Sequence, residues 1–91
     1  MESSELYNII LDRKENPKPG SYTNSLFDSG LPRIAQKVGE EGTEVVVAAL
    51  SQEKERLIEE IADLAYHVLV LMAAKDVTPA DVARELEKRH K

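Results

Sequence analysis

Carboxylates recur at helical spacing in two stretches of this sequence, and the pattern is typical of a metal site. Residues 37–50 contain Glu41 and Glu44, and a later stretch contains Glu60 and Asp63. Side chains three or four residues apart share one face of an α-helix. If the two helices pack together, four carboxylates meet, and their repulsion requires a cation among them. Ligation by carboxylate oxygens favours a hard ion, so the spacing predicts Mg²⁺ or Mn²⁺.

Asp63 stands out among these acids because it interrupts an apolar helix. Nearly every residue of 61–74 is apolar, and a short carboxylate cannot extend to solvent as a lysine does. The alternative is a buried aspartate paired with Arg56, His67 or Lys37, with no metal. We interpret His67, one turn beyond Asp63, as a hydrogen-bonding core residue or as support for a ligand, rather than as a ligand itself.

A carboxylate-held Mg²⁺ predicts phosphate chemistry. Such ions bridge phosphate oxygens, neutralise charge on a leaving pyrophosphate and activate a bound water. An acidic protein would hold a polyphosphate substrate only through its metals and a few cations. The candidate cations, each of which could equally be an ordinary surface charge, are Arg13, Lys14, Arg33 and Lys37.

The composition predicts one small domain over residues 1–91. The net charge is −5, from 17 acidic and 12 basic residues, which argues against a nucleic-acid binder. Zero cysteines exclude disulfides, thiolate metal sites and cysteine nucleophiles, and they fit a cytoplasmic protein. The acidic N-terminus lacks an apolar signal core, and no apolar run is long enough to span a membrane.

Apolar periodicity predicts an all-α fold of four helices. The segment 16–29 contains two prolines and one glycine in close succession, Pro17, Pro19 and Gly20, and is predicted to be a loop. Within it, Ser21, Tyr22 and Thr23 place three hydroxyls in a row, either for a ligand or for ordinary turn chemistry. The predicted helices run from Ser3 or Ser4 to near Asn16, from Asp28 or Ser29 to about Leu50, from Ser51 to Asp76, and from Thr78 into the basic C-terminal tail.

The third predicted helix is apolar on all sides between residues 61 and 74. Such a helix must be covered on all sides, and the remaining short helices of one chain could hardly cover it. We therefore expect a homodimer with this helix at its centre.

Taken in order, the motifs of this sequence closely resemble those of the phosphoribosyl-ATP pyrophosphohydrolase family, which belongs to the wider group of all-α MazG-like nucleotide pyrophosphohydrolases. The resemblance spans Leu6 to Arg89. Its motifs are Arg13-Lys14, Ser21-Tyr22-Thr23-x-x-Leu26, Lys37-Val-Gly-Glu-Glu-x-x-Glu44, Glu59-Glu60-x-x-Asp63-Leu-x-Tyr-His67 and Leu86-x-x-Arg89. The MazG-like relatives share only the acidic motifs, so the Ser-Tyr-Thr loop and the Tyr-His pair favour the histidine-biosynthesis branch.

The resemblance implies a dimeric helical bundle that hydrolyses phosphoribosyl-ATP to phosphoribosyl-AMP and pyrophosphate with Mg²⁺, the second step of histidine biosynthesis. It implies metal ligation by Glu41, Glu44, Glu60 and Asp63, with Glu40 and Glu59 orienting ligands or water. The residues expected to bind substrate are Arg13, Lys14, Ser21, Tyr22, Thr23 and Lys37. Two alternatives stay open: a MazG-like enzyme that cleaves dUTP or non-standard nucleoside triphosphates, and a dimeric helical interaction module whose acids are only a solvated face.

Overall fold

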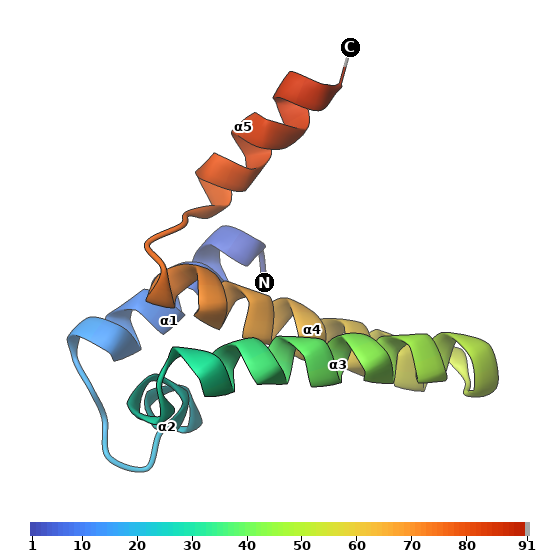
Figure 1. The fold of residues 1–91 in the computed structure, drawn as a ribbon, viewed down its shortest axis with the longest axis horizontal. Helices are drawn as coiled ribbons and strands as arrows, with labels where there is room; N and C mark the ends of the chain where they lie inside the picture. Colours follow the sequence, from blue (N-terminus) through green and yellow to red (C-terminus); the bar gives the residue numbers. More distant parts are fainter. Residues whose placement is uncertain (91) are drawn as a thin grey trace.

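The computed structural model describes residues 1–90, and all regular structure in that range is helical, which confirms the all-α prediction. Residues 1–90 form five helices, so the predicted count of four is wrong. No helix among these residues is both long and apolar enough to cross a membrane. In chain order the helices are α1 (Ser3–Glu15), α2 (Tyr22–Ser29), α3 (Leu31–Ser51), α4 (Lys54–Ala74) and α5 (Pro79–Arg89) (Figure 1).

The helix missing from the prediction is α2, which occupies the second half of the segment 16–29. Ser21 caps it, since the Ser21 hydroxyl accepts a hydrogen bond from the backbone N–H of Asn24 at 3.2 Å. Leu26 is buried in the core and stabilises the helix through packing. A helix of only eight residues leaves little periodicity to detect, and its hydroxyl-rich start resembles a turn.

Three helix N-caps differ from the prediction. Glu2 is the N-cap of α1, where Ser3 or Ser4 was expected. Gly30, with φ of +90°, precedes α3 where Asp28 or Ser29 was expected. Ser51 is the last residue of α3, where its hydroxyl donates to the Val47 carbonyl at 2.7 Å, and Glu53 is the N-cap of α4. Thr78 caps α5 as predicted.

The core lies at one end of a long helical hairpin formed by α3 and α4, which run side by side (Figure 1). Helix α1 packs along α4, and α2 packs beside the start of α3. Lys14 of α1 donates to the Ala73 carbonyl at 2.8 Å and pairs with Asp76 at 3.5 Å, which secures the C-terminal end of α4. The buried apolar residues of this core are Tyr7, Ile10, Leu26, Ile34, Leu69, Val70 and Ala73.

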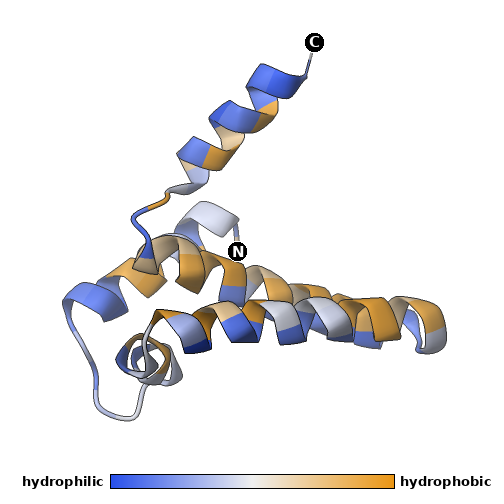
Figure 2. Cartoon of the chain, viewed as in Figure 1, coloured by the Kyte–Doolittle hydropathy of each residue, from blue (hydrophilic) through white to orange (hydrophobic). Residues whose placement is uncertain are grey.

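The opposite end of the hairpin is apolar and exposed (Figure 2). Leu50 is 83% exposed and Ile58 is 57% exposed, close to the link between α3 and α4. The accessible surface, 6395 Å², exceeds the roughly 5,300 Å² expected for a compact monomer of this mass. The radius of gyration, 14.2 Å, likewise exceeds the roughly 12 Å of a compact domain.

Helix α5 projects away from the hairpin and depends on its own N-terminal capping box (Figure 1). The Thr78 backbone N–H donates to the Asp81 carboxylate at 2.9 Å, and the Asp81 N–H donates to the Thr78 hydroxyl at 3.1 Å. The bonds from Thr78 hold the pKa of Asp81 below its ordinary 3.8.

We therefore expect α5 to be sensitive to acid. Because the folded pKa is lowered, the stabilisation is present above pH 3.8 and is lost as pH falls through the folded value. Cα chemical shifts of α5 followed by NMR from pH 6 downwards should lose helical character before those of α3. In Asp81→Asn, this acid-dependent step should be absent; if it persists, another group controls α5.

Candidate active site

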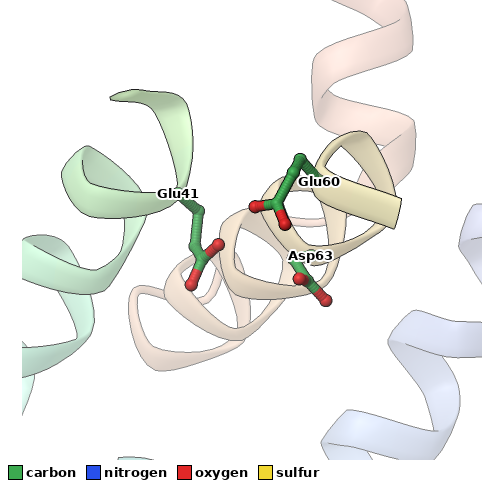
Figure 3. A group of neighbouring side chains, drawn as sticks. All are labelled: Glu41, Glu60 and Asp63. Atoms are coloured by element: carbon green, nitrogen blue, oxygen red, sulfur yellow. The ribbon is translucent and has the colours of Figure 1, made fainter. Parts of the chain in front are cut away.

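Three of the predicted ligands come together where α3 and α4 face each other. Glu41 projects from α3 toward Glu60 and Asp63 of α4 (Figure 3). One carboxylate oxygen from each residue lies within 4.8 Å of the others. Glu60 and Asp63 share a face because they are three residues apart, and the packing of the two helices adds Glu41. Oxygens this close could bind one divalent ion between them.

Glu60 is the buried member of this cluster, with 6% of its surface exposed. Its Oε1 accepts from the Arg56 guanidinium at 2.8 Å, and Arg56 also contacts Glu59 at 2.6 Å. The hydrogen bond with Glu59, followed by the charge of Glu60, raises the pKa of Arg56 above its ordinary value. Arg56 thus provides the cation that a buried carboxylate requires.

Asp63 is not buried as predicted. It is solvent-exposed, and its carboxylate makes no hydrogen bond or ion pair with residues 1–90. The ion pair with Arg56, which was the alternative to a metal for Asp63, is made instead by Glu60, because Arg56 lies four residues before Glu60 on the same helical face. Arg56 was therefore missing from the predicted site residues, although its spacing of four residues from Glu60 is apparent in the sequence.

Glu44, the fourth predicted ligand, lies outside the cluster of three. It is exposed on α3, near enough to add to the electrostatic environment of Arg56. Its role as a metal ligand stays a prediction.

The charges around the cluster do not balance. Lys37 contacts Glu41 at 3.4 Å and Glu40 at 3.6 Å, and Arg33 contacts Glu40 at 3.9 Å. Counting Glu59, Glu60, Asp63 and the nearby Glu44 as well, six carboxylates face three cations, which leaves three negative charges in excess. One divalent ion would neutralise two of these charges, so the donor set fits Mg²⁺ or Mn²⁺.

The hydroxyls of the Ser21-Tyr22-Thr23 motif contact the protein itself. Ser21 caps α2, the Tyr22 hydroxyl lies 3.1 Å from His67 Nε2, and the Thr23 hydroxyl bonds to the Tyr66 hydroxyl. Burial raises the pKa of Tyr66, so its hydroxyl stays protonated. The expected binding of substrate by these three residues stays a prediction. The prediction that His67 is a hydrogen-bonding core residue is confirmed, since it is buried and bonds through both ring nitrogens.

The predicted substrate cations lie in different places. Lys37 adjoins the carboxylate cluster, Arg13 contacts Asp12 at 3.3 Å, and Lys14 holds the end of α4. The link between α1 and α2, together with α2 itself, lines an open hollow of about 660 Å³, and Lys18 and Tyr22 are among its lining residues. Tyr22 thus lies between this hollow and α4.

Comparison with known protein families matches residues 3–90 to phosphoribosyl-ATP pyrophosphohydrolase. The chain belongs to this family. Among curated proteins, the chain is similar to the phosphoribosyl-ATP pyrophosphatase of Saccharolobus solfataricus, with 58% identity over 96% of this chain and 93% of that protein. The enzyme of the same name from Sulfurisphaera tokodaii is 59% identical over 94% and 92%, and that from Clostridium novyi is 56% identical over 96% and 79%.

The phosphoribosyl-ATP pyrophosphohydrolase assignment and the carboxylate cluster together predict metal-dependent stability. We expect Mg²⁺ at about 100 times its dissociation constant to stabilise the folded state by about 2.7 kcal/mol, which raises Tm by roughly 11–22 °C. Asp63→Asn should lose this shift while its metal-free Tm stays equal or rises, because one of the repelling charges is gone. Differential scanning calorimetry measures both values.

Glu87→Gln is the matched control for this measurement, since it removes an exposed carboxylate of α5 and should leave the Mg²⁺ shift intact. An equal shift in Asp63→Asn and in the parent protein would remove Asp63 from the metal site.

Proposed function

We propose that this chain hydrolyses phosphoribosyl-ATP to phosphoribosyl-AMP and pyrophosphate, the second step of histidine biosynthesis, with Mg²⁺ as cofactor. The observation that carries the proposal is the meeting of Glu41, Glu60 and Asp63 in a chain that matches this family over residues 3–90. The names of the curated relatives support the substrate. A cytoplasmic location belongs to the same proposal, because the substrate is a nucleotide of primary metabolism.

In this proposal each acid of the cluster has a distinct role set by its surroundings. Glu60, buried and held by Arg56, provides a fixed oxygen, while the exposed Asp63 carboxylate is open toward solvent and substrate. Glu41 closes the cluster from the opposite helix. A bound Mg²⁺ would supply charge neutralisation at the phosphate oxygens and a water of lowered pKa.

The cations and the neighbouring acids complete the proposed site. Lys37, beside Glu41, would contact a phosphate, while Glu40 pairs with Lys37 and Glu59 pairs with Arg56. Glu44 would join the metal ligands through a change of side-chain rotamer on α3. No protein nucleophile is needed, because water attacks the α–β phosphoanhydride.

The activity predicts a specific product pattern. Pyrophosphate release from phosphoribosyl-ATP should require Mg²⁺ and should exceed release from dUTP or ATP. Glu60→Gln and Asp63→Asn should each lower kcat/KM by at least about 100-fold with the fold retained, because each removes a charged ligand. Glu87→Gln should behave as the parent.

The same assay distinguishes the alternatives. Preferential turnover of dUTP would assign the chain to the MazG-like house-cleaning enzymes, and no turnover by folded protein would favour an interaction module. Far-UV circular dichroism checks the fold of each variant.

We further propose that the active form is a homodimer. The exposed apolar residues at the linked ends of α3 and α4 support this assembly, as does the excess of accessible surface over that of a compact monomer. A second copy would cover a face that one chain leaves open beside the carboxylate cluster. The apolar residues of this face are Val46, Val47, Leu50, Ile58 and Ile61.

The dimer proposal makes Ile58 and Leu50 sensitive to charge. We expect Leu50→Lys or Ile58→Lys to produce a monomer, because a charge buried in an apolar interface is costly. Sedimentation velocity measures the mass. The control is Asn8→Lys, which adds the same charge at an exposed position of α1, away from this face, and should leave the dimer intact. A parent protein that sediments as a monomer would contradict the proposal.

A further inference from the structure

Four consecutive side chains at the start of α2 make bonds within the protein, and together they fix α2 in place. Besides the Ser21 cap, Asn24 accepts from the Lys18 backbone N–H at 2.8 Å and donates to the Arg13 carbonyl at 2.6 Å. Tyr22 and Thr23 reach across to His67 and Tyr66 of α4. The segment that lines the open hollow is therefore attached to both α1 and α4.

The bond between Tyr22 and His67 continues to a residue of the carboxylate cluster. His67 Nδ1 lies 2.7 Å from the backbone carbonyl oxygen of Asp63. A carbonyl oxygen only accepts, so Nδ1 carries the hydrogen. In the neutral ring Nε2 is then the acceptor, and the Tyr22 hydroxyl donates to it at 3.1 Å. His67 is only 6% exposed, so its ring is held by these two bonds and by packing.

We propose that Tyr22 and His67 are positioning residues that connect the hollow beside α2 to the metal-binding turn of α4. The proposal rests on the function proposed above. Asp63 has no side-chain partner among residues 1–90, so its carboxylate direction depends on its backbone, which the His67 ring holds from one turn away. The other ring nitrogen accepts from Tyr22. His67 would thus support Asp63 through Nδ1 and hold Tyr22 for substrate binding through Nε2.

Three variants separate the two bonds of this chain. His67→Asn places an amide N–H near the position of Nδ1 and keeps the donor to Asp63, but it loses the acceptor for Tyr22. His67→Gln places an amide oxygen near the position of Nε2 and keeps the acceptor for Tyr22, but it loses the donor to Asp63. Tyr22→Phe removes the hydroxyl alone. Tyr66→Phe is the matched control, because it removes the adjacent bond between α2 and α4 without reaching Asp63.

The first readout is Mn²⁺ affinity, measured by electron paramagnetic resonance without substrate. We expect His67→Gln to weaken Mn²⁺ binding about tenfold, the lower limit for loss of a group that orients a ligand, and Tyr66→Phe and His67→Asn to stay within about twofold of the parent. Unchanged affinity in His67→Gln would overturn the proposal. A parent protein that binds no Mn²⁺ would instead refute the metal site itself, which distinguishes the two failures.

The second readout is the KM for phosphoribosyl-ATP. Tyr22→Phe and His67→Asn should raise KM by a similar factor, with less effect on kcat, and the double variant should be no worse than either single variant. Additive effects would mean that Tyr22 contacts substrate directly and independently of His67. The ¹⁵N shifts of His67 in the parent test the geometry without metal or substrate: a ring protonated at Nε2 alone would overturn the proposed chain.

Discussion

The repulsion among carboxylates held together by the packing of α3 on α4 is the constraint on which this structure depends. Glu41, Glu60 and Asp63 meet because the two long helices that carry them lie side by side. Lys37 and Arg56 neutralise part of the charge from the outer side of the cluster. The remaining excess of negative charge makes the site suitable for a divalent ion and costs stability without one.

This constraint explains the uneven distribution of the core. One end of the hairpin is fixed by the buried core, which α1, α2 and the adjoining ends of α3 and α4 form together. Near the linked end of the hairpin, Ala48 is the buried apolar residue among residues 1–90. A hairpin held at one end would let its carboxylates separate under their own repulsion. In the proposed dimer, a second copy of the chain would pack on the exposed apolar residues around Leu50 and hold this end of the hairpin together. Assembly and metal binding would therefore reinforce each other.

The sequence predicted what depends on helical periodicity and missed what depends on the partner of a side chain. The pairs Glu41–Glu44 and Glu60–Asp63 follow from spacing, and so do α3 and α4. Periodicity does not say which acid of a pair faces the neighbouring helix, so burial was assigned to Asp63 although Glu60 is the buried one. Helix α2 was missed because its stability comes from the Ser21 cap and the burial of Leu26.

The hydroxyl motif shows why such residues are difficult to interpret from sequence alone. Tyr22 finds its partner 45 residues later in the chain, at His67, and that pairing exists only once α2 has packed against α4. A hydroxyl that bonds to protein can still govern a substrate site when its partner supports a ligand. The bond from His67 to the Asp63 carbonyl gives Tyr22 that connection. In the proposed site of this chain, the hydroxyls of the motif would therefore support catalysis without touching the reacting phosphates.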